Sequence, residues 1–170
     1  MTANRQNSTR TKARKHALDI LFEADLRGAD PRETLADQIA AGERSVRPFT
    51  IQLVQGVTDH GEQLDAALRA ALGEQWSLER MPIVDRTLAR LAVFELAHTD
   101  TPLAVVANEA VDLAAEYSGQ NSPAFLNALL DRAARVLVEP AASSEETRPT
   151  EPAAPSEESD DQPVGDDPAP

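Results

Sequence analysis

The spacing of apolar residues is the feature that most constrains the fold of this chain. Apolar residues recur three and four positions apart along most of residues 11–139, where alanine and leucine dominate and β-branched runs are short. This spacing matches the turn of an α-helix, because residues three or four apart lie on the same face. The sequence therefore predicts an all-α fold, a compact domain of six or seven helices joined by short loops.

One segment, residues 83–98, predicts the central helix of that domain. Its sequence is IVDRTLARLAVFELAH, which is apolar on most of its circumference after Leu88. A helix that is apolar all round must be covered by neighbours on several sides. The other predicted helices are about 11–27, ended by Gly28; 31–41; 48–72, with a bend or close packing at Gly56 or Gly61; 102–117; and 123–137.

The carboxyl-terminal residues 140–170 have a different composition from the rest. They contain nine acids, one base (Arg148), seven prolines and a single large aliphatic residue, Val164. Such a segment buries too little apolar surface to offset its loss of conformational entropy on ordering. The sequence therefore predicts three parts: a flexible basic arm over residues 1–10, a helical domain over 11–139 and a disordered, acidic, proline-rich tail over 140–170.

The amino terminus is basic in a chain whose net charge is −13. Five bases precede the first acid, Asp19; they are Arg5, Arg10, Lys12, Arg14 and Lys15. Phosphates attract such a segment by Coulomb forces and counterion release, whereas the acidic remainder repels nucleic acid. A nucleic acid is thus the expected partner, and the alternative is a solvated, disordered amino terminus.

Residue patterns that support catalysis or metal binding are missing. The seven glycines are scattered, so no phosphate-binding loop is present, and the absence of cysteine excludes thiolate chemistry. The three histidines, His16, His60 and His98, lie on different predicted helices. Carboxylates at 109, 112 and 116 line one side of a helix, which predicts a solvated face or a contact with a basic partner. We expect no enzyme activity, no metal and no cofactor.

The sequence also predicts where the protein works. No apolar run approaches the roughly 20 residues needed to cross a bilayer, and no apolar stretch follows the amino-terminal charges as it does in a secretory signal. We therefore expect a cytoplasmic protein without a membrane partner.

Several stretches together resemble the transcription antitermination factor NusB family. They are TRTKARKHALDILFEADLRG, WSLERMPIVDRTLARLAVFELAH, VVANEAVDLAAEYSG and NSPAFLNALLD, within about residues 10–138, and they look most like actinobacterial members. The resemblance implies two three-helix bundles and binding to boxA RNA of ribosomal RNA leader transcripts together with the ribosomal protein NusE. It also implies that the complex joins elongating RNA polymerase with other Nus factors. Some relatives are dimers, so a homodimer is a further possibility.

The resemblance also assigns candidate site residues. The arginine-rich motif of the family falls on Arg10, Lys12, Arg14 and Lys15. The further RNA contacts fall on Phe22, Asn121, Ser122 and Phe125, and the NusE contact falls on an acidic face that includes Asp85 and Glu109. Aromatic rings stack on unpaired bases, but the two phenylalanines also lie on apolar stripes and fit a core role equally well. Asn121 and Ala124 replace an acid and a lysine that many relatives carry, with opposing effects on RNA affinity.

Two other functions compete with this one. The chain could be a helical protein-interaction module that binds no RNA directly. A domain of this kind also precedes the catalytic domain of certain ribosomal RNA cytosine methyltransferases, but only the acidic tail follows residue 139 here. We therefore do not expect methyl transfer.

Overall fold

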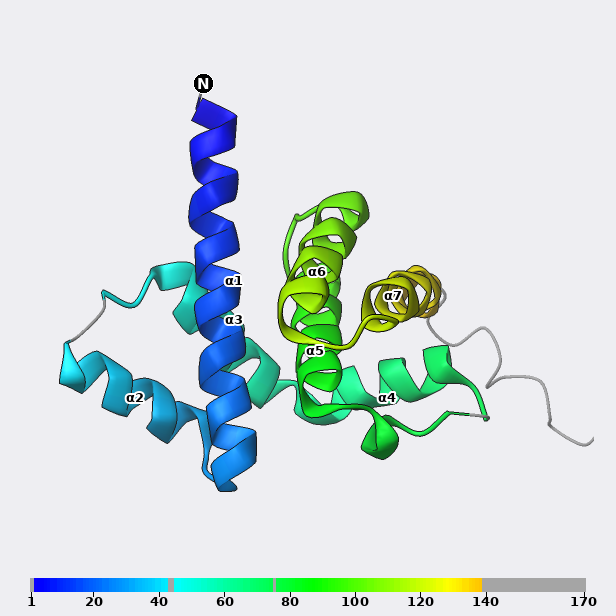
Figure 1. Cartoon of the computed structure of the whole chain (residues 1–170), viewed down its shortest axis with the longest axis horizontal. Coiled ribbons are helices and arrows are strands. Elements are labelled where there is room, and N and C mark those ends of the chain that lie inside the picture. Colours follow the sequence, from blue (N-terminus) through cyan, green and yellow to red (C-terminus); the bar gives the residue numbers. More distant parts are fainter. Residues whose placement is uncertain (1, 43–44, 75, 139–170) are drawn as a thin grey trace, which may run out of the picture. The chain divides into compact units, whose positions relative to one another are not determined.

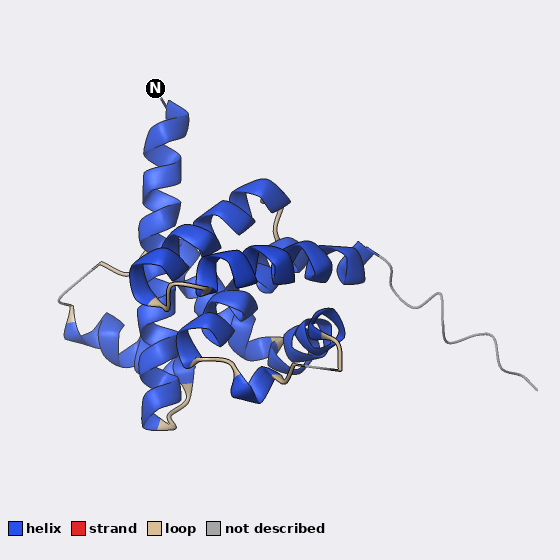
Figure 2. Cartoon of the chain, turned by 45° about the vertical axis from the view of Figure 1, so that its right-hand side comes forward, coloured by secondary structure: helices blue, strands red, loops and turns tan. Residues whose placement is uncertain are grey.

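A computed structural model describes residues 2–42, 45–74 and 76–138, and side chains from residue 9 onward. Over these residues the chain forms seven α-helices and one short 3-10 turn, with no strand (Figures 1 and 2). The helices are α1 (Thr2–Arg27), α2 (Pro31–Ala41), α3 (Pro48–Asp59), α4 (Gly61–Leu72), α5 (Ile83–His98), α6 (Leu103–Tyr117) and α7 (Ser122–Val138), and the turn is η1 (Leu78–Arg80). The all-α prediction is confirmed. The predicted tail, residues 140–170, lies outside the described part of the chain.

Residues 2–10, within the stretch 1–10 predicted as a flexible arm, differ from the prediction in their backbone. Helix α1 begins at Thr2 rather than near Thr11, so the basic segment continues the first helix and extends past its neighbours in Figure 1. The stretch from Thr2 to Arg10 contains neither proline nor glycine, so nothing in it interrupts a helix that starts upstream. The basic side chains of α1 are therefore mounted on a helix.

Local signals explain three of the helix ends. Gly28 and Gly42 follow α1 and α2 with φ of 62° and 65°, a left-handed conformation that glycine adopts without steric cost. The Asp30 carboxylate accepts a hydrogen bond from the backbone N–H of Arg32 at 2.8 Å and so caps α2, while Pro31 occupies its first turn. These are the positions that the sequence indicated.

The predicted stretch 48–72 is divided into α3 and α4 at His60. The backbone N–H of His60 donates to the Gly56 carbonyl at 3.0 Å, and its imidazole Nδ1 lies 2.9 Å from the same oxygen. Gly56 is also a point of close packing, because a Cβ built there would lie 2.0 Å from Cζ of Phe94. The break therefore occurs where α3 crosses α5 at contact distance.

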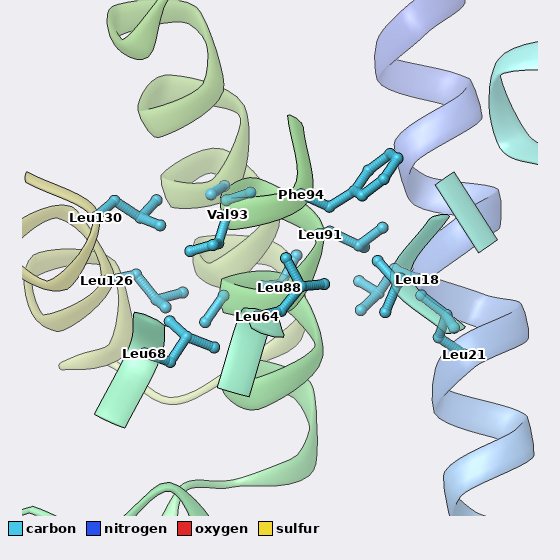
Figure 3. Close-up of a cluster of buried hydrophobic side chains, with 14 of the residues drawn as sticks. Leu18, Leu21, Leu64, Leu68, Leu88, Leu91, Val93, Phe94, Leu126 and Leu130 are labelled. Atoms are coloured by element: carbon cyan, nitrogen blue, oxygen red, sulfur yellow. The ribbon is translucent and has the colours of Figure 1, made fainter. Parts of the chain in front are cut away.

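Helix α5 is central, as the sequence predicted. Helices α1–α3 pack against one another as one bundle, α5–α7 form a second, and α4 lies against α5 and α7. Figure 3 shows Leu91 and Phe94 of α5 on the side of α1, with Leu91 beside Leu18, and Val93 on the side of Leu130. Since α5 also contacts α1 and α3, it joins the two bundles through one continuous buried core.

Candidate nucleic-acid interface

The basic residues of α1 divide into an exposed and an internal group. Arg10 and Lys12 are exposed, and Lys15 is partly exposed, with 41% of its side chain accessible. The Arg10 guanidinium lies 5.0 Å from the ring centroid of Phe49, a cation–π distance that positions the side chain on α3. The structure therefore presents two exposed cations from this motif, at positions 10 and 12.

Arg14 occupies a different environment from the one expected of a phosphate ligand. Only 4% of the residue is exposed, and its Nε and Nη2 each donate to a Glu95 carboxylate oxygen at 2.7 Å. Its Nη1 lies 3.4 Å from Glu109 Oε2, so a second, longer ion pair joins the guanidinium to α6. Burial opposes the charge most strongly, but hydrogen bonds and attraction from Glu95 and then Glu109 outweigh it and raise the pKa of Arg14.

This arrangement argues against the phosphate-binding role that the family resemblance suggested for Arg14. A guanidinium held in a buried, two-bond pair with Glu95 cannot face a phosphate without breaking that pair. Because Glu95 is 1% exposed and lies on α5, the pair fixes α1 onto the central helix. Arg14 has the spacing of the basic motif. It nevertheless lies on the inner face of α1, the face that packs against α5.

The carboxylates of α6 contact α1 and are not simply a solvated face. Glu109 accepts a hydrogen bond from Thr11 Oγ1 at 2.8 Å, and Glu116 pairs with Lys15 Nζ at 2.5 Å. Lys15 Nζ also lies 4.8 Å from the ring centroid of Tyr117. Asp112, the third carboxylate of this set, is exposed. The expected acidic surface at Glu109 is therefore largely engaged by the chain itself, and Asp112 and Glu116 carry its accessible part.

The buried carboxylate of Asp85 stabilises the turn between α6 and α7 through hydrogen bonds. It is 3% exposed, and its two carboxylate oxygens accept hydrogen bonds from Ser118 Oγ at 2.5 Å and Ser122 Oγ at 2.8 Å. Burial and these bonds leave neither Asp85 nor Ser122 (7% exposed) available as the surface contacts that the sequence suggested. Their role here is to fix the turn that holds Asn121 in an exposed position.

The aromatic candidates lie between core and surface. Phe22 and Phe125 are both partly buried, and Phe125 packs against the buried core. The ring of Trp76, which is 61% exposed, lies 5.6 Å from that of Phe125 at an interplanar angle of 45°. Sequence reasoning treated Trp76 only as part of a connector. The sequence shows a lone tryptophan between two apolar helices. Only the fold shows that this tryptophan contacts Phe125 of α7.

Two of the histidines meet although they are distant in the sequence, His60 between α3 and α4 and His98 at the end of α5. The rings of His60 and His98 are 4.1 Å apart between centroids, and Phe94 lies 5.1 Å from His98. Burial first, and the charge of His60 second, lower the pKa of His98. His16 lies 2.8 Å from Gln38 Oε1 through its Nε2 and is buried. No group of three or more possible ligands that could hold a metal ion occurs among the described residues.

The chain belongs to the NusB family, whose model matches residues 11–135. Among curated proteins it is 54% identical over 123 residues to the transcription antitermination protein NusB of Cutibacterium acnes, an alignment that covers 72% of this chain and 47% of that protein. It is 50% identical to NusB of Acidothermus cellulolyticus, with coverage of 71% and 83%, and 48% identical to NusB of Salinispora tropica, with coverage of 74% and 94%. The chain thus spans about half of the first of these relatives and most of the other two.

Solved structures agree with this family assignment. The fold matches NusB of T. maritima with a TM-score of 0.67 at 29% identity, covering 74% of this chain and 90% of the other. It also matches a crystal structure of the antitermination factors NusB and NusE in complex with dsRNA, with a TM-score of 0.66 at 26% identity, covering 75% and 96%. None of the helices in the described ranges is long and apolar enough to span a membrane.

Proposed function

We propose that this chain is a transcription antitermination factor that binds boxA RNA of ribosomal RNA operon leaders together with the ribosomal protein NusE. In this role it is a cytoplasmic, non-enzymatic adaptor whose complex joins elongating RNA polymerase and other Nus factors and supports transcription of ribosomal RNA. Family membership, the antitermination function of similar proteins and the solved complex of a relative with NusE and dsRNA support the proposal.

The observation that carries the proposal is the exposed basic edge of α1. Arg10 and Lys12 face solvent on a helix, with Lys15 half-exposed beside them, in a chain of net charge −13. Phosphates are attracted to this edge and repelled elsewhere, so the charge distribution restricts how an RNA can dock. Phosphate contacts supply affinity and register but do not read sequence.

Sequence preference must therefore come from contacts to bases beside that edge. Asn121 is exposed on the turn after α6, and the rings of Phe22 and Phe125 are each partly accessible. Amide groups hydrogen-bond base edges and aromatic rings stack on unpaired bases, which is how proteins read single-stranded RNA. We assign base contacts to these three residues and phosphate contacts to Arg10, Lys12 and Lys15.

The proposed contact with NusE uses the accessible carboxylates of α6. Asp112 is exposed and Glu116 retains 53% of its side-chain exposure while pairing with Lys15. A basic ribosomal protein is attracted to such a surface, and complementary charge favours orientation and association rate. Binding energy is then shared between RNA and protein, so neither contact alone needs to be strong.

A salt titration of boxA RNA binding, with and without NusE, tests the proposal. Replacing Arg10 or Lys12 with alanine should weaken RNA binding and reduce the slope of log K against log salt by about 0.7 for each phosphate that the variant no longer neutralises. Arg27→Ala is the matched control, because Arg27 is an exposed base at the opposite end of the same helix.

The same titration distinguishes RNA binding from the alternative function, a protein-interaction module that binds no RNA directly. If the Arg10 and Lys12 variants bind RNA with unchanged affinity and slope, the basic edge is not the RNA site. If in addition the wild-type chain binds NusE but shows no affinity for boxA RNA, the chain is a protein-interaction module.

A further inference from the structure

Trp76 is the most exposed aromatic residue in the described part of the chain. It is the sole tryptophan of the sequence and is 61% accessible, in the connector between α4 and η1. Tryptophan is usually largely buried in a monomer, and an exposed indole is typical of a binding surface. Neither the proposed RNA contacts nor the proposed NusE contact gives this side chain a role.

The indole is held in place rather than extended alone into solvent. Its ring packs against Phe125 at 5.6 Å and 45°, a tilted geometry common for aromatic pairs. Two residues further along, Leu78 at the start of η1 is 1% exposed and anchors the segment in the core. Glu79 accepts hydrogen bonds from Ser77 Oγ at 2.7 Å and from Arg69 Nη2 at 2.9 Å, which ties the connector to α4.

Two side-chain contacts and the order of residues along α6, the next turn and α7 link this aromatic pair to the basic edge of α1. Lys15 Nζ lies over the ring of Tyr117 at the end of α6, and the short turn with Asn121 follows. Phe125 then lies one helical turn into α7 and carries Trp76 on its ring. Through Phe125, Trp76 therefore meets the start of α7, the helix that follows the turn with Asn121 to which we assign a base contact.

We propose that Trp76, supported by Phe125, stacks on an unpaired base of the bound RNA, beyond the contacts assigned so far. The charges around the connector balance, with Glu74 and Glu79 against Arg69 and Arg80, so phosphate attraction does not dominate there. An open indole face on a fixed support matches the flat face of a nucleobase, and stacking needs no local net charge. The inference rests on the proposed function, because it requires that RNA binds along α1.

Intrinsic fluorescence gives a direct test, since all tryptophan emission of the full chain comes from position 76. BoxA RNA is titrated into the protein while emission is recorded, and binding is followed in parallel by the anisotropy of end-labelled RNA. We expect the emission to be quenched along the same saturation curve as the anisotropy. Saturating anisotropy with unchanged emission would overturn the stacking role and leave the proposed function intact, whereas no change in either signal would contradict RNA binding itself.

Substitutions provide an independent measurement. Trp76→Ala should weaken RNA binding about 5- to 150-fold, the range expected for one stacked base, with an unchanged salt slope. Trp76→Phe should retain most of the affinity because it keeps an aromatic face. Leu26→Ala is the control, since Leu26 is 60% exposed on α1 and has no proposed RNA contact.

The same variants distinguish a protein contact. If Trp76→Ala leaves RNA affinity unchanged but weakens binding of NusE to the RNA-free chain, the indole contacts protein and the inference is wrong. Equal RNA affinity of Trp76→Ala, Trp76→Phe and wild type would also exclude stacking.

Discussion

Replacing Arg14 with methionine tests whether this residue of the basic motif serves the fold or the RNA. The substitution removes a guanidinium that is 4% exposed and leaves the Glu95 carboxylate, 1% exposed, without its two 2.7 Å hydrogen bonds. Breaking a buried ion pair from one side costs about 3–5 kcal/mol, because the remaining charge is desolvated and unpaired. Native domains have only about 5–15 kcal/mol in total, so a loss of this size is a large fraction of the stability.

Urea unfolding measures the change in stability. With a slope of about 2 kcal/mol per molar urea, a decrease of about 4 kcal/mol lowers the midpoint by about 2 M while leaving the slope unchanged. The double variant Arg14→Met with Glu95→Leu removes both charges and should recover most of the stability, since an apolar replacement of a buried pair is often close to neutral. Lys12→Ala, at an exposed position two residues away, should change stability by less than about 0.5 kcal/mol.

The structural role and the RNA-binding role of Arg14 predict opposite results. If Arg14→Met unfolds at the wild-type midpoint and instead reduces the salt slope of RNA binding, as expected for Lys12→Ala, then Arg14 is a phosphate ligand. Burial of the guanidinium would then not determine the role of Arg14.

Two further predictions concern packing and protonation. Gly56→Ala should destabilise the chain by about 1–3 kcal/mol or more in urea unfolding, because its Cβ would lie 2.0 Å from a ring carbon of buried Phe94. Gly61→Ala, with open space around it, should be neutral or slightly stabilising. Equal effects of the two substitutions would contradict the close crossing of α3 and α5. The lowered pKa of His98 means that the folded state binds fewer protons there than the unfolded state, so its contribution to stability is present above about pH 6.5 and is lost as the pH falls through the folded pKa. The free energy of unfolding of His98→Gln should therefore fall less than that of wild type between about pH 7 and pH 5. Parallel curves of stability against pH would exclude His98 as the source of the pH dependence.

Much of the fold was predictable because its determinants are local. The helical period of apolar residues, Gly28 and Gly42 after helix ends, and Asp30 with Pro31 at a helix start all act within a few residues of where they lie. The division of residues 48–72 into two helices at His60 was harder to predict from the sequence. It coincides with the approach of Gly56 to Phe94, a contact between residues distant in the sequence.

The candidate site was predictable in residue type but not in exposure. A basic run on one helix is visible in the sequence, yet successive residues of a helix point about 100° apart, so Lys12 and Arg14 face different environments. Which direction is inward depends on where α5 and α6 pack. For the same reason Asp85 and Ser122, each a plausible surface residue, became partners in a buried network.

Taken alone, the amino-acid order determined that the chain is helical, that residues 83–98 form its centre and that positive charge gathers at one end, since periodicity and charge are properties of neighbouring residues. Only the tertiary structure decided which charges remain available to a partner. It paired Arg14 with Glu95, turned Lys15 toward Glu116, left Arg10 and Lys12 exposed and placed Trp76 on Phe125. Burial and ion pairing depend on distances between helices, which no local pattern encodes.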